Sequence, residues 1–153
     1  MRQPHPLVSK TGDEMDYASW QSLPAMFFEV AGQKGERPFL WAKREGRYRP
    51  LGWAAAADTV RRLAHALVAL GIAPGDRIVL VAENRPEWAI ADLAALKLGA
   101  IVVPLYHTLT AGASKYILND SACKIIFVEN KALFDVVGGI RGEVPSLETV
   151  VAF

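Results

Sequence analysis

Hydrophobic positions recur along the chain with two different spacings, which separate predicted helices from predicted strands. Residues 54–70 place apolar side chains at helical intervals, and Gly71 follows as a stop signal. The opposite face of this helix is polar and carries Asp58, Arg61, Arg62 and His65. Residues 77–82 instead form a short, almost entirely apolar run that is rich in β-branched side chains. This run is too short for a helix and predicts a buried strand.

Start and stop signals define the remaining elements in the same way. Ser22 is a predicted N-cap for the first helix, and Asn84 for the helix that begins at Pro86. Gly46 supplies turn chemistry between two short apolar segments, which predicts an antiparallel hairpin. In chain order the elements are a helix at 23–32, hairpin strands at 39–42 and 48–51, a helix at 86–98, a strand at 101–105, a helix at 113–118, and strands at 124–128 and 147–153.

Strands and helices alternate from residue 77 onward, and this order predicts an α/β fold with parallel strands and right-handed crossovers. We expect three layers, a largely parallel sheet with flanking helices, and in addition the short antiparallel hairpin. Continuously apolar strands require cover on both faces of the sheet. Because the helix at 86–98 is apolar nearly all round, we expect that one layer is missing from this chain.

The domain organisation is predicted to be simple. Residues 1–21 lack periodicity and form an N-terminal arm, whereas residues 22–153 are long enough to build one hydrophobic core. Residues 147–153 stop inside a predicted strand without a polar tail, so we interpret Phe153 as a cut in a longer protein.

Composition points to no particular class of partner and leaves the cytoplasm as the default location. The 17 basic and 16 acidic side chains give a net charge of +1, which does not favour nucleic acid or an anionic membrane as the main partner. A single cysteine, Cys123, cannot form an intrachain disulfide and fits a reducing compartment. Charged residues and prolines interrupt the first twenty residues, and no apolar run reaches the roughly 20 residues that span a bilayer. We therefore expect a cytoplasmic protein without a transmembrane segment.

Several sequence motifs together resemble the adenylate-forming superfamily of acyl-CoA synthetases. Residues 71–105 (GIAPGDRIVLVAENRPEWAIADLAALKLGAIVVPL) carry most of the resemblance, and residues 50–53 (PLGW) and 116–121 (YILNDS) extend it. The segment AENRPEW at 82–88 is most similar to the long-chain fatty acid:CoA ligase branch. The chain thus resembles the N-terminal region of an AMP-forming synthetase, with residues 22–153 as part of its AMP-binding domain.

The resemblance implies a whole enzyme that adenylates a fatty acid with ATP and then transfers the acyl group to coenzyme A. ATP, Mg²⁺ and coenzyme A are the implied co-substrates of that enzyme, and none is expected to bind to this chain alone. The implied partners are the rest of the synthetase chain, a second copy in a homodimer and, in the whole enzyme only, a fatty acid. The implied location is the cytoplasm, with peripheral membrane contact in the whole enzyme.

The family's reaction motifs are missing from this sequence. It has no Ser/Thr/Gly-rich phosphate loop ending in lysine, no Tyr-Gly-x-Thr-Glu run and no C-terminal catalytic lysine. The nearest glycine-containing segments, at 9–12 and 138–142, match no nucleotide fingerprint and are interpreted as arm and loop. We therefore assign no catalytic, cofactor-binding or metal-ligating residue and expect the chain alone to be inactive. Two alternatives stay open: a stand-alone truncated paralogue that acts as an interaction or regulatory module, and a small Rossmann-like enzyme, which would need a glycine-rich turn after a strand.

Departures from the family pattern lie at three places. Gly52 replaces the usual serine or threonine cap and Ala56 the capping-box glutamate, so we expect the helix after Gly52 to fray. His107 follows Tyr106 where proline is common, and residues 111–113 replace the usual proline-glutamate-glutamate helix start.

Ligands of open α/β sheets bind at the carboxyl ends of the strands, which leaves two loops as candidate sites. The candidate residues in them are Asn84, Arg85, Tyr106, His107 and Thr108. For Asn84 we favour helix capping over ligand contact. His65 is interpreted as a solvated surface residue, Cys123 as a small buried side chain, and Trp88 as core or interface packing.

Overall fold

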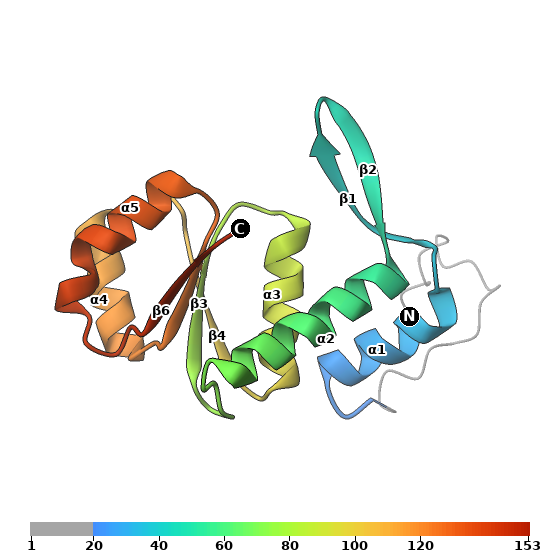
Figure 1. Cartoon of the computed structure of the whole chain (residues 1–153), viewed down its shortest axis with the longest axis horizontal. Coiled ribbons are helices and arrows are strands. Elements are labelled where there is room, and N and C mark those ends of the chain that lie inside the picture. Colours follow the sequence, from blue (N-terminus) through green and yellow to red (C-terminus); the bar gives the residue numbers. More distant parts are fainter. Residues whose placement is uncertain (1–19) are drawn as a thin grey trace, which may run out of the picture.

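A four-stranded parallel sheet runs through the computed structural model, which describes residues 20–153 (Figure 1). The strands lie in the order β4-β3-β5-β6, and every neighbouring pair is parallel. Their bounds are Arg77–Val81 for β3, Ile101–Leu105 for β4, Ile125–Val128 for β5 and Thr149–Ala152 for β6. The predicted arm at 1–21 lies, except for residues 20 and 21, outside the described part of the chain.

Helices of this chain cover both faces of the central strands β3 and β5. The helices are α1 (Leu23–Lys34), α2 (Trp53–Ala69), α3 (Pro86–Lys97), α4 (Ala111–Ser121) and α5 (Lys131–Ile140). Alternate residues of β3 point into two separate cores: Ile78 and Leu80 pack with α1, α2 and α3, whereas Val79 and Val81 pack with α4 and α5. The fold is therefore a three-layer α/β arrangement, and the predicted fold class is confirmed.

We expected one of the layers that cover the sheet to be missing from this chain. Over β3 and β5 no layer is missing, because helices of this chain cover both faces of these strands. Helix α3 buries Ile90, Ala91, Leu93, Ala94 and Ala95 and packs against α1, α2 and the sheet. Its remaining residues are half-exposed, except Lys97, which is exposed. Cover is incomplete at both edge strands: Ile101 of β4 is 53% exposed, and the residues of β6 are half-buried or exposed.

An antiparallel hairpin precedes α2 and stands out from the body of the molecule (Figure 1). It is formed by β1 (Pro38–Arg44) and β2 (Arg47–Gly52). The two turn residues between them, Glu45 and Gly46, both have positive φ, at 51° and 78°. Positive φ at both central positions is the geometry that continues the twist of the flanking strands. The predicted hairpin is confirmed.

Two local predictions were wrong. Asn84 does not cap α3: the N-cap position belongs to Arg85, and no side chain caps this helix end. Residues 138–142 are not a loop either, because Gly138 and Gly139 lie within α5 and a short 3₁₀ turn follows at Arg141–Glu143. Asn130 starts α5 by accepting a hydrogen bond from the Leu133 N–H, and buried Val137 and Ile140 hold the helix on the sheet.

Helices α1, α2 and α4 begin with different caps: a side chain accepts an N–H of the first turn of α1 and of α4, whereas backbone carbonyls accept the first N–H groups of α2. Ser22 accepts from the N–H of Ala25, which confirms it as the cap of α1, and Thr110 accepts from the N–H of Ala113 to start α4 two residues earlier than predicted. Helix α2 has no side-chain cap at Gly52. Backbone carbonyls replace it: the Trp53 N–H donates to Arg37 O at 3.0 Å, and the Ala54 N–H donates to Gly35 O at 2.9 Å.

Candidate functional site

A pocket of about 580 Å³ lies at the carboxyl ends of β3 and β4, where an open α/β sheet is expected to bind ligands. We call it the β3–β4 pocket. Its wall is formed by Ala82, Glu83, Asn84, Trp88, Pro104, Leu105, Tyr106 and His107. Three of the sequence candidates, Asn84, Tyr106 and His107, are therefore brought together from two loops more than twenty residues apart.

The other two candidates do not line this pocket. Arg85 borders a second, smaller hollow of about 320 Å³ between the hairpin and the start of α3, and Thr108 is exposed without lining either. Asn84 and Trp88 line both hollows, so the two adjoin. The Trp88 ring also packs against the core beneath α3, which is the packing role expected of it.

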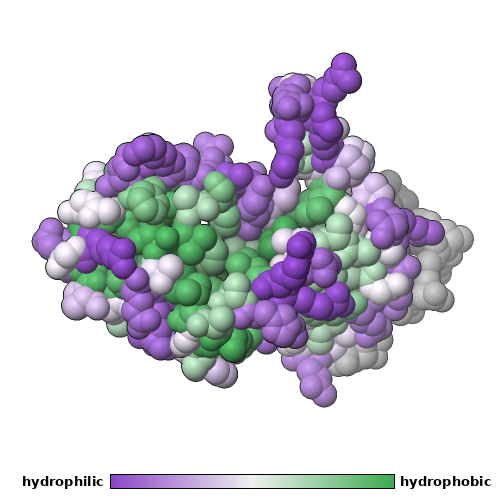
Figure 2. Space-filling view, in the orientation of Figure 1, coloured by the Kyte–Doolittle hydropathy of each residue, from purple (hydrophilic) through white to green (hydrophobic). Residues whose placement is uncertain are grey.

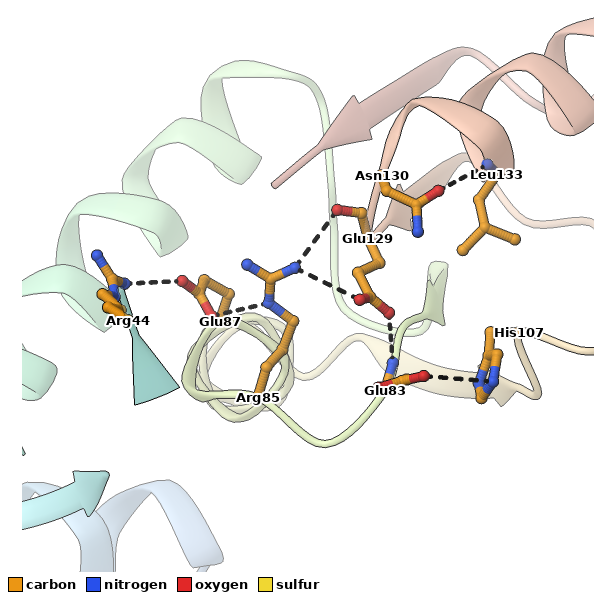
Figure 3. A network of polar contacts seen from close by, with 8 residues as sticks. All are labelled: Arg44, Glu83, Arg85, Glu87, His107, Glu129, Asn130 and Leu133. Atoms are coloured by element: carbon orange, nitrogen blue, oxygen red, sulfur yellow. Dashed lines mark hydrogen bonds and ion pairs between the residues drawn. The ribbon is translucent and has the colours of Figure 1, made fainter. Parts of the chain in front are cut away.

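Arg85 lies at the centre of a polar network, shown in Figure 3. Its Nε donates to Glu87 Oε2 at 2.9 Å, and its Nη1 lies 3.4 Å from the backbone oxygen and 4.0 Å from Oε1 of Glu129. Arg44 on the hairpin donates to the other oxygen of Glu87 at 3.1 Å. The Glu83 N–H donates to Glu129 Oε2 at 2.8 Å. This Arg85 network joins the hairpin, the start of α3 and the loops after β3 and β5.

The charges of this network reinforce one another. The hydrogen bond from Arg85, followed by the positive charges of Arg85 and Arg44, holds the pKa of Glu87 below its usual value. The hydrogen bond to Glu87 in turn raises the pKa of Arg85. The Arg85 guanidinium is thus occupied by carboxylates of the protein and lies 5.4 Å from the Phe153 ring. Its geometry suits positioning of the loops rather than capture of a phosphate.

Sequence analysis missed the acidic members of this network. Glu129 directly follows β5, so the reasoning that selected the residues after β3 and β4 could have found it. Glu87 lies in the first turn of α3, where a carboxylate is ordinary, and nothing local distinguishes it.

His107 and Glu83, which both line the β3–β4 pocket, lie close to each other. His107 Nε2 lies 3.7 Å from Glu83 Oε1, and both side chains are well exposed. The pocket therefore offers an imidazole, a carboxylate, an amide and a phenol for hydrogen bonding. Among residues 20–153 there is no group of three His, Cys, Asp or Glu side chains that could hold a metal ion.

Two other polar or reactive side chains lie where they were expected. His65 is exposed on α2, and Cys123 is fully buried beside β5. Burial raises the pKa of the Cys123 thiol, which favours the neutral form. In the described part of the chain, no helix is both long and apolar enough to cross a membrane.

Comparison with known proteins adds an independent observation. Residues 27–152 match the family described as AMP-binding enzyme. The chain is 36% identical over 130 residues to the long-chain-fatty-acid--CoA ligase FadD15 of Mycobacterium tuberculosis, and this match covers 85% of the chain and 22% of the relative. The chain thus spans about a fifth of the length of that relative.

Solved structures show the same fold. The fatty acyl CoA synthetase of M. tuberculosis superimposes with a TM-score of 0.74 at 27% identity, over 85% of this chain and 26% of that one. A putative long-chain-fatty-acid CoA ligase from Rhodopseudomonas palustris superimposes with a TM-score of 0.77 at 22% identity, over 86% of this chain and 32% of that one. The second similarity concerns the fold alone.

Proposed function

The chain belongs to the AMP-binding enzyme family, and from this premise we propose that it is the N-terminal portion of an ATP-dependent long-chain fatty acid:CoA ligase. The observation that carries the proposal is the 36% identity with FadD15, which extends over 85% of the chain. Residues 22–153 would then form the first part of the AMP-binding domain, and residues 1–21 an arm that precedes it.

In the proposed whole enzyme, the fatty acid carboxylate attacks the α-phosphate of ATP to give an acyl-adenylate, and the acyl group then passes to the thiol of coenzyme A. Charge that develops on the phosphates has to be stabilised by cationic and backbone donors, with Mg²⁺. The described residues offer no such set, because Arg85 is engaged by Glu87 and Glu129 and no metal-holding cluster occurs among them. We propose that this chain supplies scaffold and no reacting group.

Within that scaffold, we assign the β3–β4 pocket to the ligand-facing edge of the sheet. Asn84, Tyr106 and His107 are the proposed contacts, since they line the pocket at the carboxyl ends of the strands. Arg85 is proposed as a positioning residue that holds the loop carrying Asn84.

A pyrophosphate-release assay with palmitate, ATP and Mg²⁺ tests the inactivity of the isolated chain. We expect no release above a blank without enzyme, while FadD15 in the same assay releases pyrophosphate. Release by the isolated chain well above the blank would overturn the scaffold assignment.

A chimera tests the membership in a long-chain ligase. Residues 22–153 replace the matching segment of M. tuberculosis FadD15, and formation of palmitoyl-CoA is measured. We expect the chimera to retain activity, because the segment provides the same fold and the reacting groups come from the remainder. A folded, soluble chimera without activity would count against the proposal and favour a stand-alone interaction module.

A further inference from the structure

The tip of the hairpin, residues 41–50, projects from the body of the molecule, and all of its residues except the half-buried Ala42 are exposed (Figures 1 and 2). Its contact with the body is the ion pair between Arg44 and Glu87 and the small hollow that Trp41 lines beside the start of α3. Trp41 is 57% exposed and Tyr48 is 70% exposed. A two-stranded hairpin is only marginally stable by itself, and this one is anchored at its base, where Phe39 packs against Trp53. The exposed tip is therefore not explained by the core of the protein.

Positive charge is concentrated at this tip. Residues 43–49 contain four basic side chains and one acidic one, a net charge of +3, whereas the whole chain has a net charge of +1. Arg44 pairs with Glu87 and Arg49 with Glu45, and the second of these pairs is strongly exposed. Lys43 and Arg47 form no ion pair with any residue in the described range 20–153.

Strand register places the aromatic side chains together. Trp41 is paired with Pro50, and Lys43 with Tyr48, so these residues share one face of the hairpin. Arg44, Arg47 and Arg49 belong to the other face. One face thus combines two exposed rings with a lysine, and the other carries three arginines.

We propose that the hairpin tip binds the surface of an anionic membrane. Tyrosine and tryptophan rings settle at the level of lipid headgroups, and basic residues near an anionic leaflet each strengthen binding by about fivefold. The inference rests on the hairpin alone and does not require the proposed function. The proposal assigns the membrane contact to one segment. The positive charge of that segment is not apparent from the net charge of the whole chain, which is only +1.

Other occupants fit this surface less well. The tip is a convex projection only two strands wide, and it lacks the basic groove that follows the backbone of a single-stranded nucleic acid. Contact between the tips of two copies would oppose two net charges of +3.

Vesicle sedimentation tests the proposal with the 153-residue chain. The probes are vesicles of pure phosphatidylcholine and of an equimolar mixture of phosphatidylcholine and phosphatidylglycerol. We expect binding to the mixed vesicles only, weakening as salt is added. The double variant Lys43→Ala/Arg47→Ala should lose about 25-fold in affinity, on the basis of about fivefold per basic residue.

A matched control removes the same charge elsewhere. Arg62 on α2 and Lys131 on α5 are 72% and 86% exposed, so Arg62→Ala/Lys131→Ala should keep the affinity of the parent within about twofold. Circular dichroism verifies that both double variants are folded. Equal loss of affinity in the two variants, or equal binding to neutral vesicles, would overturn the proposal.

Fluorescence quenching provides a second readout. Lipids brominated near the headgroup should quench the parent chain more strongly than Trp41→Phe, because Trp41 is the tryptophan of the exposed tip. Identical quenching of the two proteins would contradict insertion of the tip. Failure to bind mixed vesicles, together with hairpin-dependent binding of an oligonucleotide or hairpin-dependent dimerisation, would assign the surface to a different partner.

Discussion

Gly52 precedes α2 at a position where a serine or threonine hydroxyl commonly caps a helix. A Cβ atom at this position would lie 3.2 Å from the backbone oxygen of Glu36. The close approach lets the carbonyls of Gly35 and Arg37 accept the first N–H groups of α2. Glycine therefore permits a backbone cap, and the fraying expected from the sequence does not follow.

Replacing Gly52 by alanine should lower the free energy of unfolding by about 1 kcal/mol, because the methyl group crowds Glu36 and offers no cap of its own. Urea denaturation measures the change. Gly32→Ala in α1 is the control: its Cβ would meet nothing within 4 Å, and alanine there should stabilise by about 0.5–1 kcal/mol. Stabilisation by both substitutions would contradict the role of the close approach.

Asp92 is a half-buried carboxylate of α3 that makes no hydrogen bond or ion pair within the described part of the chain. Burial raises its pKa, so the charged form destabilises the folded state above that pKa. We expect Asp92→Asn to stabilise the protein at pH 7. The gain should shrink as the pH falls below the raised folded-state pKa and vanish below the unfolded-state pKa, because only there is the parent carboxyl protonated in both states.

Urea denaturation of the parent and Asp92→Asn at several pH values measures this dependence. Asp58→Asn on the exposed face of α2 serves as the control, and it should not stabilise at pH 7, since Asp58 pairs with Arg62. A gain for Asp92→Asn that is independent of pH would show that its charge is not the cause.

At the scale of elements, Glu87 links the start of α3 to the hairpin and to the loop after β5 through Arg44 and Arg85. Glu87→Gln should cost about 1 kcal/mol of stability at pH 7, because two partly buried charged contacts are weakened together. The folded-state pKa of Glu87 is lowered, so this stabilisation is present above the unfolded pKa and is lost as the pH falls through the folded one.

Chemical denaturation at pH 7 and at acidic pH compares the two proteins. Glu83→Gln on the neighbouring loop is a matched control, and it should change stability by only a few tenths of a kcal/mol, because its carboxylate is 67% exposed. If Glu87→Gln and Glu83→Gln behaved alike at neutral pH, the network would have no measurable part in holding these elements.

At the scale of the whole molecule, the two cores share the strands β3 and β5, so we expect them to unfold together. Trp53 and Trp88 pack against the core of α1, α2 and α3, whereas Ile126 belongs to the core of α4 and α5. Ile126→Val should cost about 1 kcal/mol and lower the melting temperature by about 3 °C. The shift should be the same by tryptophan fluorescence and by far-ultraviolet circular dichroism.

Val136→Ala is the control for this experiment. Val136 lies on α5 but is 41% exposed, and its substitution should change stability by less than about 0.5 kcal/mol. A melting curve of Ile126→Val that is shifted by circular dichroism but unchanged by fluorescence would show that the two cores unfold separately.

Local sequence patterns predicted the strands of the parallel sheet. They also predicted that the loops after these strands meet at the carboxyl edge of the sheet. The apolar runs at 77–82 and 101–105 gave the correct strands, and residues after them supplied three members of the β3–β4 pocket. The pattern failed at α5, where Gly138 and Gly139 lower helix propensity but packing of Val137 and Ile140 outweighs it.

The sequence by itself determined the α/β class, the hairpin and the loops at the carboxyl ends of the strands, because periodicity and turn chemistry act between near neighbours. Only the tertiary structure decided which side chains meet. Arg85 contacts Glu129, 44 residues away, since the sheet places β5 beside β3. The cap of α2 and the exposed hairpin tip likewise depend on where distant segments lie, which no local pattern encodes.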